Sequence, residues 1–153
     1  MKLKITLIAL FFIYSITYSQ NKTVNKVNYA NIEIDVPQNY KANSEYEIEN
    51  DNFSAQWLYL SKEMFDQNIQ NQIIKQFEDQ TKAKIISEIS FSSNGSIFNG
   101  KIYTIDNTNL KFKIVASGII NNQPLVLNLS FKSQPKSNKD LDLLMQNFIK
   151  FKD

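Results

Sequence analysis

The side chains that could do chemistry in this chain are carboxylates, lysines and hydroxyls, because histidine, cysteine and arginine are absent. Without imidazole or thiol groups, Ser-His-Asp and Cys-His catalysis and zinc binding by His or Cys are excluded. The three glycines form neither a G-x-G-x-x-G nor a G-x-x-x-x-G-K-S/T motif, so the sequence has no phosphate-cradling loop. We therefore predict no catalytic residue, no metal ligand and no cofactor.

A run of alternating acids is the first candidate site. Glu45, Glu47, Glu49 and Asp51 would point to one face of an extended strand. Such a row could bind Ca²⁺ through its carboxylate oxygens, but the glycine and the ligand spacing of a calcium loop are missing. Like charges along an edge strand also prevent edge-to-edge pairing. We interpret the run as a solvated edge.

Aromatic residues form the second candidate site. Phe53, Trp57 and Tyr59 share one face of a predicted strand, and Tyr40 lies shortly before it. Aromatic side chains on a sheet can stack on sugars or anchor a protein partner. The alternative is that this face packs under another element as core. We name these four residues as the candidate surface for a ligand or partner.

Lysines and a possible carboxylate pair complete the inventory. Lys101, Lys111 and Lys113, together with Lys132, could line the polar side of neighbouring strands and meet an anionic lipid or glycan. A solvated sheet face is the plainer interpretation. A hydrolase would need two acids that flank a cleft, and nothing in the spacing selects such a pair, Glu88 with Asp106 included.

The first 19 residues predict export. Lys2 and Lys4 precede an apolar run of about 12 residues, which is too short for the ~20 that cross a bilayer, and small residues follow it. We expect residues 1–19 to be a cleaved signal peptide and the mature chain to be periplasmic or extracellular in a bacterium, with no membrane span. Of the 17 basic residues, two lie in this signal, so the rest balance the 15 acids. Without a basic excess, nucleic acid is not an expected partner.

The remaining pattern predicts one α+β domain over residues 31–153, preceded by a loose leader over 20–30. Apolar positions with period 2 indicate strands, and the i, i+3, i+4 pattern indicates a helix over 62–80 and a closing helix from about 138. Asn94-Gly95 and Asn99-Gly100 are both suitable hairpin turns, and the sequence does not choose between them. We expect a mainly antiparallel sheet of about six strands with two amphipathic helices packed on it.

The order of these elements resembles a known superfamily. A strand that ends in Pro37 and is followed by Tyr40 (Ile32-x-Ile34-x-Val36-Pro37-Gln38-Asn39-Tyr40) opens many PsbP/Mog1/DcrB-like domains. A helix, a strand meander and a closing amphipathic helix that ends near Phe148-x-x-Phe151 look like the rest of such a domain. The resemblance covers most of the mature chain but includes no specific motif. It implies a non-enzymatic accessory or binding protein and carries over no functional residues.

From the sequence we thus expect an exported, non-catalytic binding or accessory protein whose ligand is an unidentified protein, small molecule or glycan. Two alternatives stay open. One is a small hydrolase that works through Asp/Glu or Ser/Lys, and the other is an immunity or inhibitor protein that blocks a secreted toxin.

Overall fold

A computed structural model of the chain describes residues 24–152. The predicted signal peptide and the start of the predicted leader lie outside these residues. In chain order, the described elements are β1 (Lys26–Tyr29), β2 (Ile32–Asp35), β3 (Lys41–Ser44), β4 (Glu47–Glu49), β5 (Phe53–Tyr59), α2 (Lys62–Asp66), α3 (Ile69–Thr81), β6 (Lys84–Ser93), β7 (Ser96–Thr104), β8 (Phe112–Ile120), β9 (Gln123–Phe131) and the 3-10 helices η1 (Asn138–Asp140) and η2 (Met145–Asn147).

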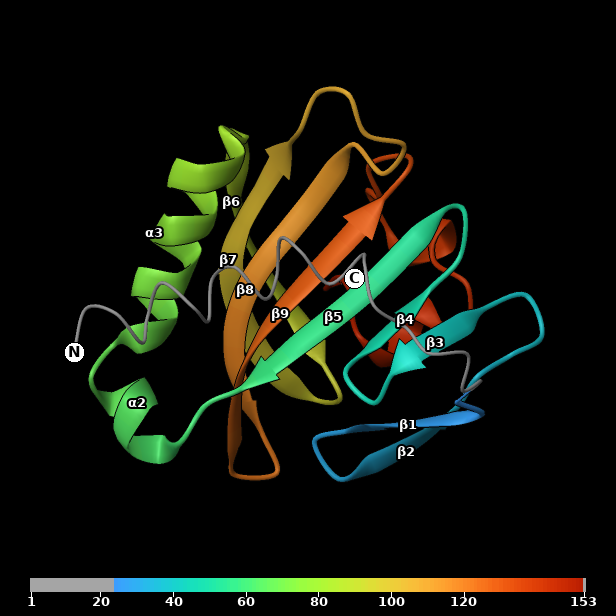
Figure 1. The fold of residues 1–153 in the computed structure, drawn as a ribbon, viewed down its shortest axis with the longest axis horizontal. Helices are drawn as coiled ribbons and strands as arrows, with labels where there is room; N and C mark the ends of the chain where they lie inside the picture. Colours follow the sequence, from blue (N-terminus) through green and yellow to red (C-terminus); the bar gives the residue numbers. More distant parts are fainter. Residues whose placement is uncertain (1–23, 153) are drawn as a thin grey trace.

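Seven strands form one sheet in the order β3-β4-β5-β9-β8-β7-β6, and β1 and β2 form a separate hairpin (Figure 1). Every neighbouring pair is antiparallel. The prediction of a mainly antiparallel sheet with a couple of helices is confirmed. The number of strands is corrected, because the molecule has a sheet of seven and a hairpin of two rather than one sheet of about six.

Two tight hairpin turns fix the register of the strand pairs β6–β7 and β8–β9. Asn94-Gly95 joins β6 to β7 and Asn121-Asn122 joins β8 to β9, and all four residues have a positive φ between 46° and 79°. Such turns match the right-handed twist of the strands that they connect. The rival turn at 99–100 lies inside β7, where a Cβ on Gly100 would come within 2.1 Å of a backbone oxygen of β8. The structure therefore assigns the hairpin to Asn94-Gly95.

One face of the sheet carries the larger hydrophobic core. The β1–β2 hairpin and the C-terminal segment cover this face. Its centre is aromatic: the rings of Tyr29 and Phe148 lie 4.9 Å apart between centroids, and Trp57 packs on both at 5.2 and 5.6 Å. These three side chains are at most 1% exposed. The two ends of the described chain are thus joined through the core.

The opposite face carries a smaller core beneath α3. Its buried residues come from α3, from the three strands β7, β8 and β9, and from the residue that follows β5, namely Ile69, Ile73, Phe77, Tyr103, Val115, Val126 and Leu60. The helix therefore lies over one half of the sheet, as Figure 1 shows. No described helix covers the other half of this face, over β4 and β5.

The first predicted helix is interrupted. Ser61 caps α2, since its side chain accepts a hydrogen bond from the backbone N–H of Met64. Asn68 then adopts a left-handed conformation with φ 59° and separates α2 from α3. Asparagine tolerates this conformation better than most residues. A single stripe of apolar residues runs through both helices, so periodicity alone could not reveal the break.

The predicted closing helix is wrong. In its place the chain forms η1 and η2, separated by Leu141 in an extended conformation with φ −109° and ψ 129°. The Asp142 carboxylate accepts hydrogen bonds from the backbone N–H of Met145 and from the Tyr40 hydroxyl, which replace the bonds of a regular helix. The apolar residues still face the core, as Leu141 and Phe148 are buried.

The predicted loose leader over 20–30 is also corrected. Residues 26–29 form β1, which pairs with β2, and Tyr29 is fully buried. Polar residues outnumber apolar ones in this segment, so hydropathy did not indicate a strand. The acidic run at 45–51 lies next to one edge of the sheet rather than on it: β3 is the edge strand, whereas Glu47 and Glu49 are on β4, which pairs with both β3 and β5.

Candidate ligand-binding cavity

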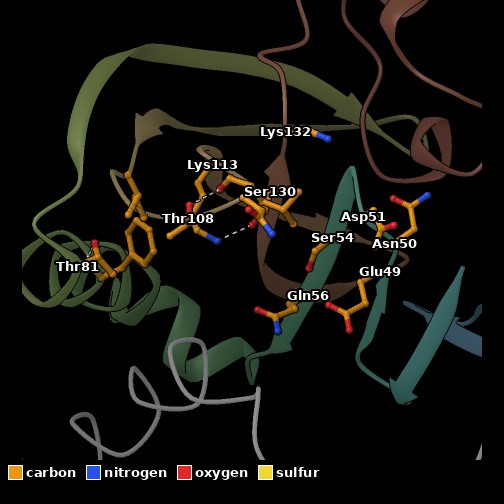
Figure 2. Close-up of a pocket in the computed structure, with 14 residues that line it drawn as sticks. Glu49, Asn50, Asp51, Ser54, Gln56, Thr81, Thr108, Lys113, Ser130 and Lys132 are labelled. Carbon is orange, nitrogen blue, oxygen red and sulfur yellow. Dashed lines mark hydrogen bonds between the residues drawn. The ribbon is translucent and has the colours of Figure 1, made fainter.

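A cavity of about 970 Å³ opens on the sheet face that α3 covers only in part. The last turn of α3 and the loop before β8 border it on one side, and the β4–β5 connection borders it on the other (Figure 2). Polar side chains from the four adjacent strands β4, β5, β9 and β8 supply part of its floor, and apolar side chains such as Phe77, Ile105 and Leu110 line the rest. Figure 2 labels ten of its lining residues: Glu49, Asn50, Asp51, Ser54, Gln56, Thr81, Thr108, Lys113, Ser130 and Lys132.

A straight row of four polar residues crosses the floor. Lys113 on β8 lies opposite Ser130 on β9, Ser130 lies opposite Ser54 on β5, and Ser54 lies opposite Glu49 on β4. Residues in register across an antiparallel sheet point to the same face. The row therefore presents an ammonium group at one end, a carboxylate at the other and two hydroxyls between them. We call these four residues the polar row.

Lys113 is the unusual member of the polar row. Its Nζ donates a 2.6 Å hydrogen bond to Oγ of Ser130, whose side chain is almost fully buried. Burial lowers the pKa of Lys113 to about 8, because a desolvated ammonium group loses the hydration that stabilises its charge. No carboxylate within the described part of the chain forms an ion pair with it. At neutral pH Lys113 is therefore a charged group without an opposite charge.

The acidic end of the polar row is less enclosed. Oε1 of Glu49 accepts from Lys41 at 3.1 Å and from Asn43 at 2.9 Å. Asp51 follows two residues later, is exposed and also lines the cavity. Within residues 24–152 no ion pair involves Asp51. One oxygen of Glu49 and the whole carboxylate of Asp51 thus remain available on this side.

The amide of Gln56 extends the floor beside the polar row, and Asn128 supports it from β9 without lining the cavity. Nδ2 of Asn128 donates to Gln56 at 3.3 Å, and Nε2 of Gln56 donates to Glu47 at 3.1 Å. Asn128 is 3% exposed, and its Oδ1 has no hydrogen-bond partner among the described residues. An unsatisfied buried acceptor of this kind is uncommon. This acceptor sits on β9 two residues before Ser130 and on the same face.

The predicted aromatic surface is not a surface. Phe53 and Trp57 are at most 1% exposed, and Tyr40 is 8% exposed. Tyr59 is half-buried, and its hydroxyl accepts from the backbone N–H of Ala30 and donates to the carbonyl of Asn28. All four residues face the β1–β2 hairpin and the C-terminal segment, so the core alternative describes them and they are not proposed again as a ligand surface.

The other sequence candidates are separated by the fold. Lys113 and Lys132 reach the cavity, whereas Lys101 donates to Glu78 on α3 at 2.9 Å and Lys111 is exposed outside it. Glu88 lies on β6, and Asp106 forms an ion pair with Lys84. Within residues 24–152 no group of three or more acids is placed to hold a metal ion.

In the sequence, Lys113 is only one of several lysines on predicted strands, and neither Ser54 nor Ser130 is a candidate. The signal that could have found them is the alternation of Ser54 and Gln56 with Phe53 and Ala55 on β5, and of Asn128 and Ser130 with Leu127 and Leu129 on β9. Both strands have one apolar and one polar face over these residues, although the pairing of the two strands could not be read from the chain.

Comparison with known proteins adds no relative. No family model matches the chain, and no curated protein matches it. Among the described residues, none of the helices has the length and apolar character needed to cross a membrane.

Proposed function

We propose that this chain is an exported, non-catalytic binding protein that holds a small ligand in the cavity through an anionic group on that ligand. A single observation carries the proposal: the ammonium group of Lys113 lies on the cavity floor with a hydroxyl as its hydrogen-bond acceptor, and no carboxylate of residues 24–152 pairs with it. A ligand carboxylate or phosphate would supply the opposite charge.

The energetic argument favours a ligand over a purely structural role. A buried ammonium group lowers the stability of the fold unless it is paired. Methionine or leucine would fill the same space on β8 without that cost. A strongly perturbed titratable group in a cleft is a recognised mark of a functional site. Lys132 adds a second positive charge to the lining of the cavity.

Features of the sequence support an exported and non-catalytic role. The predicted signal peptide favours export, and the lack of histidine, cysteine and arginine disfavours most catalytic machinery. The resemblance to PsbP/Mog1/DcrB-like domains, which rests on element order alone, is compatible with an accessory or binding role.

The proposal can be tested with simple anions. Acetate, succinate, phosphate and sulfate would be titrated into the purified chain at pH 7 by calorimetry, each against Lys113→Met. Lys111→Met serves as the matched control, because Lys111 precedes the same strand but is exposed outside the cavity. We expect at least one anion to bind, Lys113→Met to weaken that binding about tenfold or more, and Lys111→Met to leave it unchanged. If no anion binds, or if the two variants behave alike, the proposal is wrong.

A small hydrolase is the second candidate, and one observation favours it. The 2.6 Å hydrogen bond between Lys113 and Ser130 joins a potential general base to a potential nucleophile, and the lowered pKa of Lys113 would suit a base near neutral pH. Against it, Ser130 lies within a central strand, where the register engages the neighbouring backbone N–H groups in the sheet. An oxyanion hole needs such donors to be free.

Turnover of p-nitrophenyl acetate separates the two candidates. A hydrolase would show activity that Ser130→Ala abolishes and that Ser54→Ala, which alters a neighbouring hydroxyl, largely retains. A binding protein would show no turnover above the rate of the Ser130→Ala variant.

A further inference from the structure

We infer that the ligand is an extended zwitterion whose anionic and cationic ends are about 10 Å apart, as in a tripeptide. This inference rests on the proposed anion-binding role of Lys113 and adds a second, oppositely charged contact. The polar row carries it, because Lys113, which has no ion-pair partner among the described residues, lies at one end, and Glu49, which has one oxygen without a described partner, lies at the other.

The separation follows from the spacing of the strands. Nζ of Lys113 lies 2.6 Å from Oγ of Ser130, so the positive charge stands above β9 rather than above its own strand. Lys132 follows the end of β9, where its backbone N–H donates to the carbonyl of Asn52, so it lies beside the β4–β5 connection. From β9 to β4 there are two strand spacings of about 4.8 Å each, which gives about 10 Å.

The acidic end is suited to an ammonium group. The contacts of Glu49 with Lys41 and Asn43 both use Oε1, so Oε2 has no partner among the described residues. Asp51 lies beyond the end of β4 at the rim of the same cavity. An ammonium group placed between these two carboxylates would receive acceptors from both, whereas an anionic group there would be repelled.

The floor between the charged ends is polar, which suits a ligand with hydrogen-bonding groups along its length. Ser54 and Ser130 supply hydroxyls that donate or accept. Gln56 also lines the cavity and adds an amide group beside these hydroxyls. A chain of amide groups would offer both donors and acceptors to this floor, while an alkyl chain would leave them unpaired.

Three peptides test the inference. Trialanine carries both charges, N-acetyl-trialanine lacks the cation, and trialanine amide lacks the anion. Three extended residues span about 10 Å. Binding to the purified chain at pH 7 would be measured by calorimetry. We expect trialanine to bind about tenfold or more tightly than either modified peptide.

Two variants assign each end. Asp51→Asn should remove most of the preference for trialanine over its N-acetyl form and keep the preference over the amide. Lys113→Met should do the opposite. Glu45→Gln is the matched control for the acidic end, because Glu45 is exposed on the same segment and does not line the cavity.

The results separate this inference from the proposed function. If N-acetyl-trialanine binds as well as trialanine, the cationic contact does not exist and the inference is wrong, while the anion site stands. If none of the peptides binds although simple anions do, the inference is again wrong. If neither peptides nor simple anions bind, both are overturned.

Discussion

Replacing Lys113 with methionine should stabilise the protein at neutral pH, and the gain should disappear in alkaline solution. Methionine has nearly the same length and no charge, so it fills the space on β8 without a desolvation cost. The lysine is half-buried and lines the cavity.

The magnitude follows from the pKa. Burial lowers the pKa of Lys113 from 10.5 to about 8. A lysine whose pKa is lower in the folded state costs stability while it is charged in both states, and the cost is relieved as pH rises from about 8 to 10.5. At about 1.4 kcal/mol per pKa unit, the penalty at pH 7 is about 3 kcal/mol. Loss of the hydrogen bond to Ser130 returns about 1 kcal/mol, so a net gain of about 2 kcal/mol is expected for Lys113→Met.

Trp57 provides the assay, because it is the one tryptophan of the chain and is 1% exposed. Urea unfolding followed by its fluorescence gives the free energy of unfolding of both proteins at pH 7, 8, 9 and 10. Burial also raises the pKa of Tyr29 and Tyr103, which lowers stability above about pH 10. That effect is common to both proteins and cancels in their difference.

The reasoning is refuted if the stability of the natural protein does not rise relative to Lys113→Met between pH 7 and 10. A constant difference would mean that Lys113 titrates in the folded protein as an exposed lysine does. Lys111→Met, at an exposed position, should show no pH-dependent difference at all.

Three further substitutions have expected outcomes in the same unfolding assay. Gly100→Ala should destabilise the fold by about 3 kcal/mol or more, because its Cβ would collide with the β8 backbone. Gly95→Ala should cost only about 1 kcal/mol, because this position has φ +79° but lies in open space. Equal losses of stability in the two variants would contradict the assignment of the hairpin turn to Asn94-Gly95. Tyr29→Phe should cost about 1–2 kcal/mol, because it leaves the buried hydroxyl of Ser93 without its 2.9 Å partner, and a neutral result would show that water replaces that partner. Burial alone would raise the pKa of Glu78, but the hydrogen bonds that its carboxylate accepts outweigh burial and hold this pKa below its usual value, so the stabilisation by Glu78 is lost as pH falls. Glu78→Gln should therefore lower the free energy of unfolding by about 1 kcal/mol at pH 7 and leave it unchanged near pH 3. A loss of stability that persists in acid would refute the ionic explanation.

Local patterns in the sequence predicted the strands well where one face is apolar. Leu125, Leu127 and Leu129 alternate with smaller or polar residues, and they form the centre of β9. The prediction of a closing helix was wrong because the same i, i+3, i+4 spacing also fits two 3-10 turns that bury the same side chains. The Asp142 carboxylate bonds to the distant Tyr40 hydroxyl and to the backbone of Met145, and the first of these contacts could not be read from the local sequence.

The candidate site could not be predicted from local sequence patterns, because strand pairing brings its residues together. Ser54 and Ser130 are opposite each other only because β5 pairs with β9, across two helices and three strands of intervening chain. Alternation places each serine on a polar face but not beside the other. The aromatic face of β5 was prominent in the sequence because the side chains are large, and large side chains are more often core than surface.

The contact between Tyr29 and Phe148 has a consequence for how the chain acquires its structure. It closes a loop of more than one hundred residues through the centre of the molecule, and loops of that kind are closed late and slow the acquisition of native structure. A polypeptide whose aromatic centre needs both of its ends stays open until nearly all of it is present. For the exported role that we propose, this late closure would keep the chain open while it crosses a membrane.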